Sequence, residues 1–325
     1  MKNVRLIFII FLLTIATGCN REHINIPSLD SNTSLLVTNL KEPSISILNL
    51  KNEEGSNIGI PFIISAITAK DESYVFAAGK NEKNLFALDF GNNEMRPLFE
   101  VGEGIIDMEY NKDNSLLYTA NVQKNSIQII DMEKELVINE IKVGDYPVQM
   151  EQHGVFLYVL AGGSGEIYVL DLDKEEVIKT FEVNHRPAGL LFDGELLWVG
   201  GHGASGELND RVYAYDPESG NEITSVKIGL MPIFFHQDEE DSPIYVLSHG
   251  DHRLSRLNST TFQLEDQLEL CDNPNFMSGD SDYLYVSCID GDEVMIIDKK
   301  DWKIINSFSF EGGPFLLYKG GTHLE

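Results

Sequence analysis

The chain has 325 residues, and its 42% of hydrophobic side chains are enough to build a large core. It carries 52 acidic and 24 basic side chains, a formal net charge of −28. This charge excludes nucleic acid as a partner, because binding to a phosphate backbone depends on lysine and arginine.

The first residues have the pattern of a secretory signal peptide. Lys2 and Arg5 form a short basic region, and an apolar run follows over residues 6–16. A membrane-spanning helix needs roughly 20 apolar residues, so this run is too short to cross a bilayer. It matches the middle region of a signal peptide instead.

The small residues 16–18 lead into Cys19. This ending resembles the lipobox of bacterial lipoproteins, in which the cysteine receives a diacylglycerol and becomes the mature N-terminus. The resemblance implies a signal peptide over 1–18, a lipid anchor on Cys19, and a location on the extracytoplasmic side of a bacterial cell membrane. An ordinary cleaved signal and an N-terminal membrane helix are the alternatives. We expect 19–32 to be a lipidated linker.

Seven short apolar segments of similar sequence recur after the linker. Their anchor residues lie 38 to 47 residues apart. Six of the seven anchors are aromatic, and we expect them to pack between repeats. The anchors are Leu36, Tyr74, Tyr118, Tyr158, Trp198, Tyr245 and Tyr285.

Each segment is followed by a second alternating stretch that ends in a marker residue, Asp or Asn. A third stretch follows, and in five repeats a proline lies 16 residues after the marker. The markers are Asn49, Asp89, Asp131, Asp171, Asp216, Asn258 and Asp298, and the prolines are Pro147, Pro187, Pro232, Pro274 and Pro314. We interpret both as structural, because Asp and Asn set turns and proline fixes φ where the chain crosses between repeats.

A fourth alternating stretch follows each proline, so each unit contains four strands. Four strands repeating about every 41 residues indicate a β-propeller. We therefore predict an all-β fold over 33–325, a seven-bladed β-propeller with four antiparallel strands per blade. The N-terminal part supplies only three strands of the first blade, at 33–39, 43–49 and 55–60, and the segment 315–320 completes that blade.

The repeat resembles the YVTN-type (YncE-like) β-propeller proteins, whose units run through a "YV-x-N" strand, a strand ending in Asp, a strand ending in Val-Gly, and Pro. The segments 117–147 and 157–187 are the most similar copies. Blades 1 and 6 depart from the pattern, with Asn49 and Asn258 at the Asp position. The resemblance implies the fold and does not specify the function, since members include surface-layer-like proteins, binding proteins and, among related propellers, lactonases and lyases.

Histidines and acidic residues concentrate in the loops of the later repeats, which we expect to open on one face. His202 and His249 each lie four residues after their anchor. Histidine with carboxylate suits a divalent metal or general acid–base chemistry. The predicted ligand or metal face comprises His185, Arg186, His202, His249, Asp251, His252, Asp272 and Asp290, with Asp292 nearby. The alternative is a set of scattered loop residues without a common function.

Two other features have weaker functional interpretations. The glycine-rich stretch 201–206 matches G-x-G-x-x-G, but a loop and a strand follow it where a dinucleotide site needs a helix, so we reject that site. Cys271 and Cys288 end strands that run to the same face. Two buried free thiols are the favoured interpretation, and a disulfide is the alternative.

These features favour a lipid-anchored binding or scaffold module for a protein or small ligand. The alternatives are a metal-assisted enzyme of the propeller lactonase or lyase type and a structural component of the cell envelope or surface layer. Catalysis is the less favoured interpretation, and the sequence predicts no catalytic residue. No cofactor is expected, with a divalent metal as the alternative.

Overall fold

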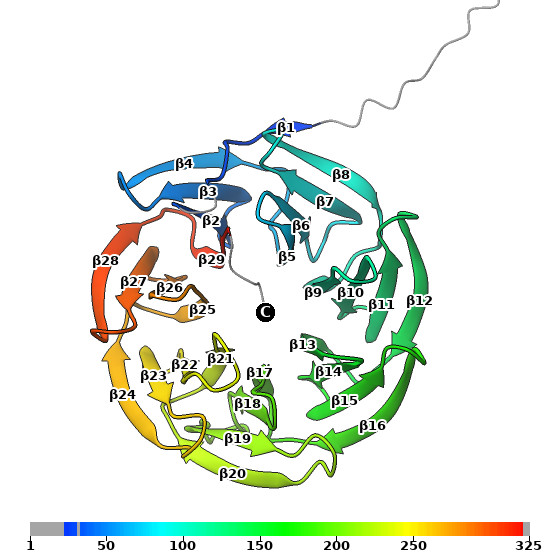
Figure 1. The fold of residues 1–325 in the computed structure, drawn as a ribbon, viewed down its shortest axis with the longest axis vertical. Coiled ribbons are helices and arrows are strands. Elements are labelled where there is room, and N and C mark those ends of the chain that lie inside the picture. Colours follow the sequence, from blue (N-terminus) through cyan, green and yellow to red (C-terminus); the bar gives the residue numbers. More distant parts are fainter. Residues whose placement is uncertain (1–22, 31–32, 321–325) are drawn as a thin grey trace, which may run out of the picture.

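The computed structural model describes residues 23–30 and 33–320, and seven antiparallel sheets stand around a central channel in it (Figure 1). The predicted seven-bladed β-propeller is thereby confirmed. The predicted signal peptide and Cys19 lie outside the described residues. Within them, no helix is long and apolar enough to cross a membrane.

Each blade presents its innermost strand to the channel and packs its second strand behind it. The innermost strands are β5 (Ala66–Asp71), β9 (Ile105–Asn111), β13 (Pro147–His153), β17 (Pro187–Phe192), β21 (Pro232–His236), β25 (Pro274–Gly279) and β29 (Pro314–Lys319). The second strands are β2 (Ser34–Asn39), β6 (Tyr74–Ala78), β10 (Leu116–Asn121), β14 (Phe156–Ala161), β18 (Leu197–Gly201), β22 (Ile244–Ser248) and β26 (Tyr283–Cys288).

The remaining two strands of each blade extend the sheet outward from the channel to the outer rim of the ring. The third strands are β3 (Ser44–Asn49), β7 (Asn84–Asp89), β11 (Ser126–Asp131), β15 (Glu166–Asp171), β19 (Arg211–Tyr215), β23 (Arg253–Leu257) and β27 (Glu293–Asp298). The outer strands are β4 (Glu54–Gly59), β8 (Glu94–Glu100), β12 (Leu136–Lys142), β16 (Glu176–Glu182), β20 (Glu222–Lys227), β24 (Leu264–Glu269) and β28 (Lys303–Ser309).

The core lies between the blades, around the second and third strands. All six residues of β2 are buried, whereas the outer strand β4 of the same blade is largely exposed. A second strand has a neighbouring blade on both faces, so its apolar residues need not alternate with polar ones. The anchor residues fill this space as expected: Tyr158 packs against Leu190 and Val199 of the next blade.

Both ends of the chain contribute to one blade. The strand β29 pairs with β2, with Leu36 opposite Tyr318 and Val37 opposite Leu317. The bounds of these strands and of β3 and β4 lie within one residue of the predicted ones. A single sheet therefore joins the two ends of the ring, which leaves no open inner edge between the first and last blades.

One strand has no counterpart in the sequence prediction. The short strand β1 (Ile24–Asn25) lies in the range assigned to the linker and pairs with β8, which makes this sheet five-stranded. The next residue, Ile26, is buried in the adjacent core. The chain entering the propeller is thus held against the rim of the second blade before it begins the first (Figure 1).

The marker residues set the turns that lead into the outer strands, as the sequence predicted. Asp131 Oδ1 accepts hydrogen bonds from the backbone N–H groups of Glu133 and Lys134, at 3.0 and 2.9 Å. Asn258 Oδ1 accepts the same two bonds from Thr260 and Thr261, at 3.1 and 2.8 Å. An amide oxygen serves as well as a carboxylate here, which explains why Asn replaces Asp in two blades.

Candidate functional site

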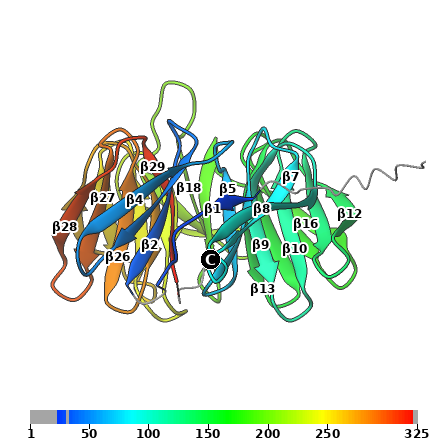
Figure 2. The same cartoon turned by 90° about the horizontal axis from the view of Figure 1, so that it is seen from above.

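The predicted site residues lie in two sets of loops on one face of the ring, which we call the upper face. These loops follow the second strand of a blade or lead into the innermost strand. The β18–β19 loop is the longest of the first set and rises above the ring in Figure 2. This loop contains His202, which directly follows β18, just as His249 directly follows β22.

His202 and His249 form a pair at the channel. Their ring centroids are 5.1 Å apart with an interplanar angle of 77°. Burial lowers the pKa of both imidazoles, and the proximity of His249 lowers that of His202 further. Both rings are therefore predominantly neutral at pH 7. His249 Nδ1 lies 3.3 Å from Asn273 Oδ1. The buried Nε2 atom of His249 has no hydrogen-bond partner among the described residues.

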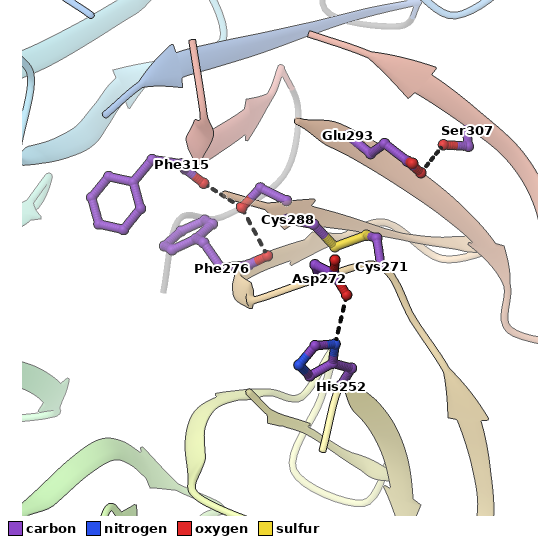
Figure 3. The surroundings of a disulfide bond; sticks show 9 residues. His252, Cys271, Asp272, Phe276, Cys288, Glu293, Ser307 and Phe315 are labelled. Atoms are coloured by element: carbon purple, nitrogen blue, oxygen red, sulfur yellow. Dashed lines mark hydrogen bonds and ion pairs between the residues drawn. A yellow bond between two sulfur atoms is a disulfide. The ribbon is translucent and has the colours of Figure 1, made fainter. Parts of the chain in front are cut away.

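Three other predicted residues engage in local contacts on the upper face. His252 Nδ1 lies 3.1 Å from Asp272 Oδ1 in an exposed pair (Figure 3). Asp251 Oδ1 accepts a hydrogen bond from Leu230 N at 3.0 Å. His252 has a φ of 56°, and Asn125 occupies the same left-handed turn position in another blade with a φ of 51°. The turn geometry of His252 is therefore a property of the repeat rather than of a special site.

Of the remaining predicted residues, Arg186 touches the histidine pair directly, because its backbone O accepts a hydrogen bond from His202 N at 3.0 Å. The others touch the pair indirectly or make contacts elsewhere. Asp290 Oδ2 accepts a hydrogen bond from Asn273 Nδ2 at 3.0 Å, so Asn273 links Asp290 to His249. Asp292 lies 3.0 Å from Lys41 Nζ. His185 and Arg186 are exposed, and His185 lines a separate surface depression with acidic neighbours. Across residues 23–30 and 33–320, no group of three or more His, Cys, Asp or Glu side chains could hold a metal ion.

Cys271 and Cys288 are joined in a disulfide, where the sequence favoured two free thiols. Cys288 ends β26 and Cys271 lies in the loop that leads into β25, so the two Cα atoms are only 5.8 Å apart (Figure 3). The pairing of β25 with β26, in which Pro274 faces Cys288, causes this proximity. Strand register, which the sequence pattern does not reveal directly, brings the two sulfur atoms together.

A cavity of about 320 Å³ lies in the channel beneath the histidine pair, and both His202 and His249 line it. One part of its wall is polar, with Asp107 and Glu109 from β9 and Gln149 from β13. Another part is aromatic, with residues from β21, β25 and β29, namely Phe234, Phe276 and Phe315. An enclosed space with an apolar wall and a few polar groups is typical of small-ligand sites.

Asp107 is one of several residues of this wall that the sequence did not predict as part of a site. Its Oδ2 accepts a hydrogen bond from Met150 N at 2.6 Å and its Oδ1 accepts one from Met108 N at 3.0 Å. Burial nevertheless raises the pKa of Asp107 to about 7. The sequence does contain a signal for this residue. The position equivalent to Asp107 holds Gln149, Phe234 or Phe276 in three other innermost strands, so Asp107 differs from them in being a carboxylate.

Comparison with known proteins identifies the fold and no family. Neither a protein-family model nor a curated protein sequence matches the chain. The structure of apo AztD from Citrobacter koseri is similar, with a TM-score of 0.58 and 12% identity over 87% of this chain and 96% of that one. The dihydro-heme d1 dehydrogenase NirN in complex with DHE has a TM-score of 0.64 and 14% identity, over 88% and 68% of the two chains.

The hydrazine synthase of Kuenenia stuttgartiensis is also similar, with a TM-score of 0.60 and 17% identity over 77% of this chain and 87% of that one. These identities are too low to carry a function from one propeller to another, because the fold supports many unrelated activities. The comparisons establish the β-propeller architecture alone.

Proposed function

We propose that this protein is a lipid-anchored, extracytoplasmic binding propeller that holds a small ligand in the upper part of its central channel. The cavity beneath His202 and His249 is the observation that carries the proposal. It combines apolar rings and carboxylates on the innermost strands with two neutral imidazoles that directly follow strands, and such pre-organisation lowers the entropy lost on binding.

Two further points support a binding role. NirN, part of which has a similar architecture, was solved in complex with DHE. A metal-assisted enzyme has less support, because no group of three or more His, Cys, Asp or Glu side chains among the described residues could hold a metal ion. A scaffold or envelope component would not need a channel cavity of this composition.

Native mass spectrometry of the full-length protein, purified in mild detergent after incubation with a small-molecule cell extract, tests the binding role. The wild-type protein should carry a non-covalent adduct that is lost in Ala188→Phe. Ala188 lines the cavity, and Phe315 occupies the matching position of β29, so a phenylalanine at this position is compatible with the fold. The exposed outer-strand variant Ile223→Ala is the matched control. Identical adducts on Ala188→Phe and wild type would contradict the proposal.

The anchor is tested separately by metabolic labelling with an alkyne fatty acid in bacterial cells. The wild-type protein should incorporate the label and sediment with membranes, because two or three acyl chains anchor far more firmly than one. Cys19→Ala removes the thiol that the lipid needs and should abolish the label. Cys271→Ser is the control, since loss of that thiol should leave labelling intact. Label on Cys19→Ala would contradict the anchor.

A further inference from the structure

The two sides of the channel cavity differ in chemistry: one carries carboxyl groups and the other carries aromatic rings. This difference indicates a class of ligand. The strand β9, which carries Asp107, lies across the channel from β21 and β25, which carry Phe234 and Phe276 (Figure 1). A ligand that fills the space between them meets a carboxyl group on one side and aromatic rings on the other.

We propose that the cavity takes a small organic cation, a protonated amine on an apolar body, with the ammonium group against Asp107 and the body against the phenylalanines. The inference rests on the proposed binding function and names the class of ligand for the same site.

The charges on the wall favour a cation over a neutral or anionic ligand. The described residues that line the cavity include Asp107 and Glu109 and no lysine or arginine. Glu109 Oε1 accepts a hydrogen bond from Gln152 N at 2.9 Å, which keeps this carboxylate on the wall. Burial disfavours the charged form of the Asp107 carboxyl, and an ammonium group beside it supplies an opposite charge that favours this form.

The histidine at the mouth adds a matching acceptor. Asn273 Nδ2 donates to Asp290 Oδ2, so its Oδ1 is the atom that faces His249 and accepts the Nδ1–H of the imidazole. In a neutral imidazole this leaves Nε2 as an acceptor, and that buried atom has no partner among the residues described. A primary ammonium group has three N–H donors for the carboxylates of the wall, whereas a quaternary ammonium group has none.

The aromatic wall suits the apolar body of the ligand. The rings of Phe234 and Phe276 have centroids 4.6 Å apart at an interplanar angle of 51°, and Phe315 lies on the same cavity. Aromatic faces bind apolar groups by contact area and attract nearby cations through the ring quadrupole. A cavity of about 320 Å³ is at the small end of ligand pockets, so the body is a single ring or a short chain.

Isothermal titration calorimetry of the full-length protein with three probes of similar size tests the ligand class. The probes are phenethylamine, 2-phenylethanol and 3-phenylpropanoate, which differ mainly in the charge of the polar end. Saturable binding should occur with the amine, with an affinity at least about tenfold higher than for the alcohol, and should be absent for the acid.

Two variants locate the interaction. Asp107→Asn should weaken amine binding at least about tenfold. If thermal unfolding shows that Asp107→Asn does not fold, Glu109→Gln serves as the second variant. Asp272→Asn is the matched control, since it removes one negative charge from the same face outside the cavity wall. Equal weakening in Asp272→Asn would mean that the surface charge, not the cavity, attracts the amine.

The affinity of wild type for the amine should also rise between about pH 5 and pH 8. Asp107 ionises in this range, and protonation of His202 and His249 at low pH would add repulsion, while an alkyl amine stays protonated throughout. Preference for the alcohol or the acid, or no saturable binding of the amine, overturns the ligand class. The adduct experiment with Ala188→Phe judges the binding function independently of these outcomes.

Discussion

At the residue scale, the same side chain type has two different roles in this propeller. The marker Asp131 is half-buried at a turn and accepts two backbone N–H bonds. Asp107 also accepts two backbone N–H bonds, but it lies on the wall of a narrow channel. Hydrogen bonds lower the pKa of a carboxyl and burial raises it, and at Asp107 burial prevails.

The raised pKa of Asp107, about 7 against 3.8 for the free side chain, predicts a pH-dependent contribution to stability. Between these values the folded protein binds more protons than the unfolded chain, so this contribution falls as the pH rises through that window. The melting temperature of wild type relative to Asp107→Asn should therefore decrease between about pH 4 and pH 7, measured by differential scanning fluorimetry. A difference that stays constant with pH would show that Asp107 titrates like a solvated carboxyl.

At the scale of the elements, strand pairing joins the four strands within a blade, and side-chain packing joins each blade to its neighbours. The seventh blade is the one with a covalent link in addition, because the disulfide ties the start of β25 to the end of β26. The loop that it closes spans 17 residues and contains the first hairpin of the blade.

Loss of this link should destabilise the protein by about 3 kcal/mol, the chain-entropy estimate for a loop of this length. Urea unfolding of the wild-type protein, with and without reductant, measures the effect. The double variant Cys271→Ser/Cys288→Ser should be less stable than the oxidised wild type, should match the wild type in reductant, and should show no response to reductant itself. A wild-type midpoint that reductant leaves unchanged would show that the disulfide does not stabilise the fold.

At the scale of the whole molecule, ring closure makes stability a joint property of the two ends. In β29, Leu317 is fully buried and Tyr318 nearly so, and both face strand β2 from the other end of the chain. Burial of a large apolar side chain contributes about 1.5–3 kcal/mol. The three buried residues Leu316, Leu317 and Tyr318 together therefore contribute an amount comparable with the total stability of about 5–15 kcal/mol.

Truncation after Gly313 removes β29 and should abolish cooperative folding of the ring. The truncated chain should show broad thermal unfolding by circular dichroism and rapid cleavage by a dilute protease, because β2 then exposes its inner edge. Phe315→Ala in the full chain is the control: this side chain lines the channel and is less buried than Leu317, so the variant should keep a cooperative transition. Cooperative unfolding of the truncated chain would show that the pairing of β29 with β2 is not required for cooperative folding of the ring.

The sequence by itself determined the number of blades, the bounds of the strands in the first blade, the turn-setting role of the markers and the closure by the C-terminal strand. These features repeat along the chain and depend on local chemistry, such as an Asp that accepts the N–H groups two and three residues later. It also located the loops that carry His202 and His249, since loops at equivalent positions open on the same face.

Only the tertiary structure decided which polar groups share the channel. Asp107 comes from β9 and Phe276 from β25, and they face one another because three blades separate them around the ring in one direction and two in the other. The Cys271–Cys288 bond and the docking of β1 on β8 likewise depend on strand register and on contacts between distant segments. The pKa of Asp107 depends on burial, and burial is a property of the closed ring rather than of any repeat within it.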